Sequence, residues 1–269
     1  MKAAFGIVVI ARDEETRLGR CLQSLEGSGA DPVVVVVDSR TRDDTAAVAR
    51  AYTKHVIVAD GQRGRLRNIG YRHVNQPFVG FLDADMLATT DYFRYLAQFL
   101  DQRPGVAAIA GRQFARQACL FSRLECQYWN YRRAVGTGGA MFRVAALDEV
   151  GGFRDELNVG EDADVLHRLR QRGWDIAWTP AVAVQHEHAP DIRAWYHKMT
   201  HGSSAGLHWR AWVRAGSSPM VGLHAALTTG CLHLAWYVPV RAVVMLRKQH
   251  KEYQPLGAHR DPLRGNCGG

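Results

Sequence analysis

The sequence has few cysteines, and none of them stands in a spacing typical of a metal or redox site. Its 269 residues include five cysteines and no CxxC pair. Structural zinc sites and thioredoxin-like redox motifs commonly use such pairs, so neither is expected. The cysteine count is odd, and the apolar run of residues 3–11 is too short for a secretory signal. We therefore expect a protein with reduced thiols on the cytoplasmic side of a membrane.

Two glycine-rich phosphate-binding motifs are also missing. No GxGxxG follows the first apolar run, so a Rossmann dinucleotide enzyme would lack its phosphate-binding turn. No GxxxxGK[ST] is present, which argues against a P-loop nucleotide site. Zinc-finger spacing, RNA-binding signatures and arginine-rich runs are absent as well, so no nucleic acid partner is expected.

What the sequence does have is an ordinary globular composition with an excess of positive charge. Hydrophobic residues make up 47% and charged residues 22% of the chain, and the formal net charge is +8. This length suits one large domain or two small ones and can bury a sizeable core. The basic balance favours anionic partners, such as phosphorylated substrates or anionic lipid.

Apolar runs rich in β-branched residues alternate with helical periodicity through the first half of the chain. Residues 5–10, 33–37 and 78–82 are typical of buried strands, and residues 55–58 are expected to form a further, short strand. Helices between strands at this spacing predict a mostly parallel α/β sheet with right-handed crossovers. Polar or charged residues follow each strand, and the carboxyl ends of parallel strands form the edge where ligands bind. We therefore expect one polar crevice along this edge.

The fourth strand ends in two acids separated by one residue, Asp83-Ala84-Asp85. Two carboxylates on a tightening turn can face one divalent cation, because hard cations prefer oxygen ligands. A solvated loop, or a cap for the helix that starts near Asp91, explains the same residues. The spacing alone leaves both interpretations open.

A second acidic cluster and a histidine occur later in the chain. Residues 160–164 read Gly-Glu-Asp-Ala-Asp and precede a helical pattern, so they suit either a helix N-terminus or a general base. Short strands are expected at 174–178 and 181–184, followed by His186 and His188. Histidines one residue apart point to the same side of a strand, and either could complete a metal site.

Other segments have two interpretations each. The small residues 136–142 indicate a turn where the backbone approaches another group closely. Residues 112–134, rich in arginine and aromatics, suit an acceptor-binding helix or a helix that packs on the sheet. The apolar stretch 219–246 suits an in-plane amphipathic helix on a membrane surface, core packing or a homodimer interface.

Taken together, these motifs resemble family 2 glycosyltransferases of the GT-A fold. The matching segments are the opening strand and nucleotide turn (7–26), the second nucleotide loop (35–45), the Ala-Arg-Asn-x-Gly stretch (65–70), the DxD motif (81–85) and the ED motif (160–164). The resemblance covers about residues 3–190. It implies a GT-A-like, Rossmann-like domain at 1–190, a C-terminal helical segment at 191–252 and a tail at 253–269.

The resemblance also implies donor-binding roles. Asp13 and Asp38 would contact the base and ribose of a nucleotide-sugar, and Arg67 and Asn68 would line the nucleotide pocket. Asp83 would contact the ribose. The sequence departs from the family pattern at Asp13, where asparagine is commoner, and at Arg40 and Thr41, where glycine and serine are usual. The altered loop leaves the nucleotide open, with UDP expected first and GDP second.

For catalysis, the resemblance implies that Asp85, Asp83 and His186 hold Mn²⁺ or Mg²⁺ and that Asp162 deprotonates the acceptor hydroxyl. The expected function is metal-dependent transfer of a sugar to a lipid or envelope-glycan acceptor, with inversion, by a peripheral protein on the cytoplasmic face of the inner membrane. The alternatives are a nucleotidyltransferase and a non-catalytic nucleotide-sugar-binding protein.

Overall fold

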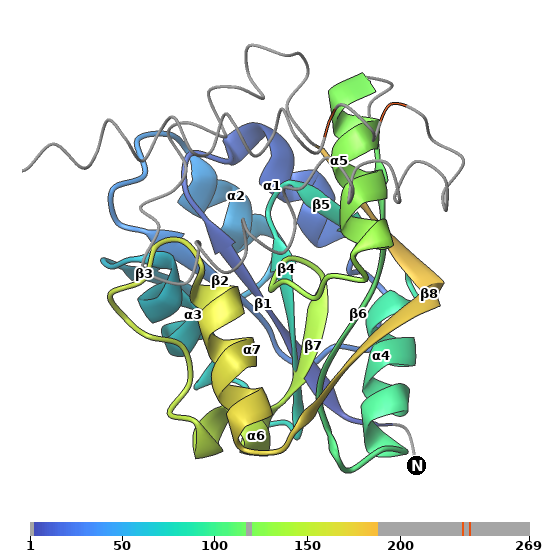
Figure 1. The fold of residues 1–269 in the computed structure, drawn as a ribbon. Coiled ribbons are helices and arrows are strands. Elements are labelled where there is room, and N and C mark those ends of the chain that lie inside the picture. The colour runs from blue at the N-terminus through green and yellow to red at the C-terminus, as the bar shows by residue number, and fades with distance from the viewer. Residues whose placement is uncertain (1–2, 117–119, 188–232, 234–236, 238–269) are drawn as a thin grey trace, which may run out of the picture.

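The computed structural model describes residues 3–116, 120–187, 233 and 237, which form an eight-stranded mixed sheet with helices on both faces (Figure 1). The strands are β1 (Phe5–Ala11), β2 (Val33–Asp38), β3 (Val56–Ala59), β4 (Phe78–Asp83), β5 (Met86–Ala88), β6 (Val106–Ala115), β7 (Ala140–Arg143) and β8 (Asp175–His186). The helices are α1 (Glu15–Gln23), α2 (Thr45–Tyr52), α3 (Arg63–Tyr71), α4 (Tyr92–Asp101), α5 (Leu120–Tyr131), α6 (Val144–Glu149) and α7 (Glu161–Gln171). The strand order is β3-β2-β1-β4-β7-β6-β8-β5.

The first half of the sheet is parallel, as the alternation of strands and helices predicts. β1 lies between β2 and β4, and β3 pairs with the outer side of β2. Ile10 is in register with Asp83, and Ala11 is in register with Val37. The carboxyl ends of β1, β2 and β4 therefore meet at one edge, which brings the residues after each strand together.

The second half of the sheet departs from the simple alternation of strands and helices. β6 runs for ten residues, from Val106 to Ala115. The two short strands expected at 174–178 and 181–184 form one strand, β8, which pairs with β6 across register irregularities. The three-residue strand β5, for which the sequence pattern predicts no strand, pairs with the end of β8. A strand this short has no periodicity of its own, so only its distant partner defines it.

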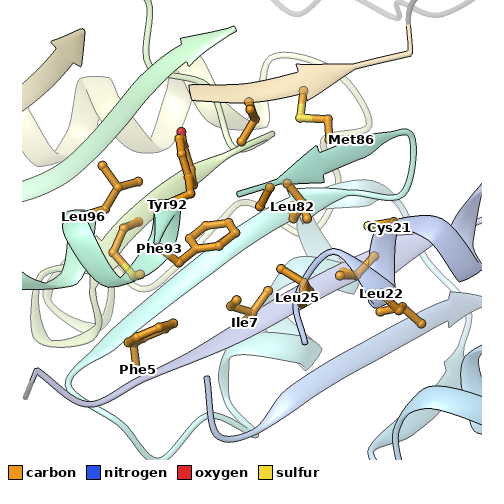
Figure 2. Close-up of a cluster of buried hydrophobic side chains, with 14 of the residues drawn as sticks. Phe5, Ile7, Cys21, Leu22, Leu25, Leu82, Met86, Tyr92, Phe93 and Leu96 are labelled. Carbon is orange, nitrogen blue, oxygen red and sulfur yellow. The ribbon is translucent and has the colours of Figure 1, made fainter. Parts of the chain in front are cut away.

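Each face of the sheet has its own core layer. Ile7 and Val9 of β1 pack with α1, α2 and α4, whereas Val8 packs with α3, α6 and α7 on the other face. This two-sided burial explains the unbroken β-branched runs, because neither face of these strands meets water. Figure 2 shows part of the first layer, where Leu22 from α1 and Phe93 from α4 approach β1. Each such buried side chain stabilises the fold by about 1.5–3 kcal/mol.

Residues 112–134 are predicted to contain a helix that either binds the acceptor or packs on the sheet. Residues 120–131 form α5, and Tyr128 on this helix is buried. Glu125, also buried, accepts hydrogen bonds from the Trp129 indole and from the hydroxyl of Tyr237. The packing interpretation is thus confirmed for Tyr128, and acceptor binding by this helix stays a prediction.

Most of the C-terminal third is outside the described residues. The expected amphipathic helix at 219–246, the tail at 253–269 and His188 all fall there, so the domain boundaries stay predictions. Among the described residues, none of the helices combines the length and the apolar character required to cross a bilayer.

Candidate active site

The carboxyl edge of the sheet gathers the charged residues that the sequence motifs single out. β1, β2, β4 and β8 end at this edge, and α3 and α7 begin there. The predicted site residues on or beside it are Asp13, Asp38, Arg67, Asp83, Asp85, Asp162 and His186. Their contacts divide them into three groups, described in turn.

The first group is built around the buried guanidinium of Arg67. This α3 side chain is only 4% exposed, and it donates hydrogen bonds to Glu161 on α7 and, at 3.2 Å, to Oδ1 of Asp83. A buried charge is tolerated only with such partners. Arg67 therefore joins the end of the DxD strand to the first turn of α7, two elements that are distant in sequence.

Asp162 lies beside this group. Its Oδ1 accepts the backbone N–H of Ala163 at 2.7 Å. Burial and the nearby Asp83 carboxylate raise the pKa of Asp162 above its usual range, although Arg67 opposes the shift. The residue at the N-cap is Gly160, without a side-chain cap, so the acids lie inside the first turn of α7. A helix N-terminus favours acids at this position, so both interpretations of Asp162, as an N-terminal acid and as a general base, stay open.

The glycine-rich turn before β7 passes close to both acids. A Cβ on Gly138 would lie 2.5 Å from Oδ2 of Asp83, and one on Gly136 would lie 3.1 Å from Oδ2 of Asp162. The predicted close approach of the backbone is confirmed. Residues 136–139 thus form a surface against which the two carboxylates rest, and a side chain at 138 would displace Asp83.

The second group is Asp85 with His186. Oδ2 of Asp85 lies 3.2 Å from Nε2 of His186, and the backbone N–H of Glu187 donates to the Asp85 carbonyl at 2.8 Å. The pairing of β5 with β8, in which Met86 opposes His186, holds these two side chains together. Within the described residues, no group of three or more His, Cys, Asp or Glu side chains is arranged as a complete metal site.

The donor set of this pair suits the expected cation. Mn²⁺ accepts both carboxylate oxygen and imidazole nitrogen, and a divalent ion in such sites is commonly completed by substrate phosphates. Asp85 and His186 therefore fit Mn²⁺, whereas Asp83 is bonded to Arg67 and its role as a further oxygen ligand stays a prediction. Mg²⁺, which prefers oxygen ligands, fits the two carboxylates better than the histidine.

The third group is the second nucleotide loop. Asp38 is nearly buried and accepts from Arg40 through Nε at 2.9 Å, Nη2 at 2.6 Å and the backbone N–H at 2.9 Å. Burial opposes ionisation, but these bonds lower the pKa of Asp38 below its usual value. Asp13 has a positive φ of 53° and accepts the N–H of Arg42 at 2.8 Å. Sequence reasoning noted Arg40 as a departure and missed that it pairs with Asp38.

The side chain of Asn68 bonds to the loop between α6 and α7. Its side-chain nitrogen donates to the Phe153 carbonyl at 2.7 Å and to Asp155 at 2.6 Å, and its oxygen accepts the Phe153 N–H at 2.9 Å. These partners are in the loop between α6 and α7, about 85 residues further along the chain. Glu161, the partner of Arg67, was also missed as a separate functional residue, because nothing local in the sequence indicates such long-range pairing.

Residues 3–204 match the sequence model described as "Glycosyltransferase like family 2". The chain belongs to glycosyltransferase family 2. Membership confirms the predicted family and enzyme class, and it disfavours the nucleotidyltransferase and non-catalytic alternatives.

Curated relatives are similar to this chain over part of their length. The chain is 28% identical over 226 residues to the pre-mycofactocin glycosyltransferase of Mycobacterium tuberculosis, covering 74% of this chain and 46% of that protein. It is 25% identical over 179 residues to the O-antigen chain rhamnosyltransferase WbaN of Salmonella anatum, covering 58% and 56%. The chain thus spans about half the length of these relatives.

Solved structures share the fold of this chain. The mannosyltransferase PcManGT from Pyrobaculum calidifontis, in complex with GDP-Man and Mn²⁺, superposes with a TM-score of 0.62 at 18% identity, covering 93% of this chain and 76% of that one. TarS 1–349 of S. aureus in complex with UDP gives 0.54 at 16% identity, covering 93% of each. These likenesses confirm the GT-A-like fold class.

Proposed function

We propose that this family 2 glycosyltransferase moves a sugar from a nucleotide-diphosphate-sugar to an acceptor hydroxyl at the carboxyl edge of its sheet. The observation that carries the proposal is the Arg67 bridge, which sets the candidate donor carboxylate Asp83 next to the acidic first turn of α7. Sugar transfer requires a donor-binding group on one side of the reacting carbon and a base on the other. Here β4 would supply the first through Asp83, and α7 would supply the second through Asp162.

On the donor side, Asp13 and Asp38 would contact the base and ribose, and Asp83 would contact the ribose. Arg67 neutralises Asp83 from within the fold. UDP is the first expectation and GDP the second, and solved relatives of this fold are known in complex with UDP and with GDP-Man. Arg40, which pairs with Asp38, would influence which nucleotide is bound.

The metal would be held by Asp85 and His186, together with Asp83. When bound, Mn²⁺ or Mg²⁺ would neutralise charge that develops on the diphosphate leaving group. Related structures contain Mn²⁺ with GDP-Man, and with UDP in the glucosyl-3-phosphoglycerate synthase of Mycobacterium tuberculosis.

On the acceptor side, Asp162 would remove the proton of the acceptor hydroxyl. An alcohol is a weak nucleophile until a base such as a carboxylate takes its proton. Attack from the face opposite the diphosphate inverts the anomeric centre, which NMR of the first product formed can check. The acceptor is a lipid or envelope glycan, and the net charge of +8 suits a protein that works at an anionic cytoplasmic membrane face.

A thermal-shift screen tests the proposal directly. UDP-glucose, UDP-GlcNAc and GDP-mannose are each added with and without Mn²⁺, and Tm is measured. A ligand at about 100 times its Kd stabilises the folded state by about 2.7 kcal/mol, which raises Tm by several degrees. We expect one donor to raise Tm strongly and only with Mn²⁺. Absence of any metal-dependent shift with all three would contradict the proposal.

Gly138→Ala should weaken donor binding. The new methyl group would meet the Asp83 carboxylate at 2.5 Å, and that carboxylate must move. Displacing a group that supports a metal ligand typically costs roughly 10–100-fold in affinity. We expect the Kd for the stabilising nucleotide-sugar with Mn²⁺ to rise by this factor in calorimetry. Gly105→Ala is the matched control, because a Cβ there meets nothing within 4 Å. An unchanged Kd for Gly138→Ala would show that Asp83 does not contact the donor.

A further inference from the structure

Helix α3 contacts the loop between α6 and α7 at more than one turn of the helix. Asn68 makes three hydrogen bonds to that loop, two with the backbone of Phe153 and one with the side chain of Asp155. One turn earlier, the backbone N–H of Gly64 donates to the Leu157 carbonyl at 2.9 Å. A Cβ on Gly64 would lie only 2.0 Å from the Arg154 carbonyl oxygen, so the loop is packed directly on the helix backbone.

The same helix also holds the end of this loop. The loop leads through Gly160, at a φ of 78°, into Glu161, the first residue of α7, and Glu161 is bonded to Arg67. The segment 153–161 is therefore attached to α3 at both its ends and in its middle. Asp162, the proposed base, is the next residue in the chain.

The remaining contacts of this region stiffen it internally. Arg168 of α7 donates to the carbonyls of Val150 at 2.6 Å and Gly152 at 2.8 Å, and it forms an ion pair with Asp164. Arg154 pairs with the other oxygen of Asp164 at 3.3 Å. The loop and the first turns of α7 are therefore bonded to each other, and α3 holds them near the strand that carries Asp83, together with the packing of Phe153 on Phe81 of that strand.

We infer that Asn68 and Gly64 are positioning residues for the base: they hold the 153–160 loop on α3 and so set the distance between Asp162 and the donor carboxylate Asp83. This inference rests on the proposed role of Asp162. It also reassigns Asn68, which the family pattern would place in the nucleotide pocket. The Asn68 side chain is 2% exposed, and its three hydrogen bonds all go to the loop, so it serves the acceptor side of the site.

The inference predicts which kinetic constant changes. Misplacing a catalytic group by about 1 Å can cost about 100-fold in rate without loss of substrate binding. We therefore expect Asn68→Ala and Gly64→Ala to lower kcat about 10–100-fold for the nucleotide-sugar selected by the thermal-shift screen, measured as donor hydrolysis. The donor KM, and the Kd for UDP or GDP with Mn²⁺, should stay within about twofold of wild type.

Asp155→Ala provides a milder variant in case the buried changes prevent folding. Asp155 is exposed, and its removal deletes one of the three bonds to Asn68 while leaving both backbone bonds in place. We expect a kcat reduction of about two- to fivefold, smaller than for Asn68→Ala, and faster amide hydrogen exchange over residues 153–164. Leu96→Ala in the other core layer is the control for general destabilisation, which should lower Tm and leave kcat unchanged below Tm.

Four outcomes separate the alternatives. A weaker nucleotide Kd with normal kcat in Asn68→Ala would place this residue in the nucleotide pocket and overturn the inference. Unchanged kcat, KM and exchange in all three variants would overturn it as well. Asp162→Asn is measured in parallel: if this variant is fully active, the proposed base is wrong, whereas if it is inactive and Asn68→Ala is normal, only the positioning role fails.

Discussion

Asp162→Asn should lower kcat for sugar transfer by roughly 10²–10⁴, the usual contribution of a positioned general base. The amide cannot take the proton of the acceptor hydroxyl, but it has nearly the same shape and can still accept the Ala163 N–H. We therefore expect the Kd for nucleotide-sugar with Mn²⁺ to stay close to wild type. Asp175→Asn, an exposed acid at the start of β8, is the matched control and should be fully active.

The pH dependence of the wild-type enzyme should report the same group. Burial raises the pKa of Asp162, so the ionised base is lost at a higher pH than for an ordinary aspartate as pH falls. The acidic limb of kcat/KM should therefore lie above the usual aspartate range. If Asp162→Asn is active with an unchanged acidic limb, another group is the base.

The Asp162→Asn change, which lowers activity, should not lower thermal stability at pH 8. Because the folded-state pKa of Asp162 is raised, its favourable contribution to folding is complete at low pH and is lost as pH rises through that value. A neutral asparagine has no such loss, so Asp162→Asn should have an equal or higher Tm than wild type at pH 8. An enzyme that gains stability when its base is removed would match the general trade between stability and activity at functional sites.

The fold could be predicted wherever local pattern and burial agree. Runs such as 33–37 are buried on both faces, so they consist almost entirely of β-branched residues and identify themselves as inner strands. The edge that gathers Asp38 and Asp83 follows from parallel topology alone. By contrast, β5 is defined by its pairing with β8, and nothing in its three residues indicates that partner.

Sequence motifs single out residues of the candidate site, but they do not predict which partners those residues contact. Sequence motifs single out Arg67 and Asn68 as neighbours in one stretch and give them one role. In the structure Arg67 bridges Asp83 and Glu161, whereas Asn68 holds Phe153. Adjacent residues on a helix point about 100° apart, so their partners depend on which elements pack on each side. That packing is a property of the whole fold.

Arg67→Met should destabilise the protein by about 3–5 kcal/mol, the usual result of removing one partner of a buried ion pair. The change leaves the Glu161 carboxylate, only 5% exposed, without its guanidinium. Asp83 is 37% exposed and can be solvated, so it should contribute little to this loss. Urea unfolding measures the effect, with Arg65→Met, an exposed arginine on the same helix, as the control.

The loss in Arg67→Met should depend on pH. Burial already raises the pKa of Glu161 and Arg67 opposes that shift, so removing Arg67 should raise this pKa further. Protonated Glu161 carries no buried charge, and the stability of Arg67→Met should therefore be closer to that of wild type at pH 5 than at pH 8.

Adding Glu161→Leu to Arg67→Met removes the buried charge at every pH, so the double variant should regain stability at pH 8. Sugar transfer should stay low, because the link between Asp83 and α7 is still absent. If Arg67→Met alone unfolds within about 1 kcal/mol of wild type, the guanidinium is not what holds these two elements together.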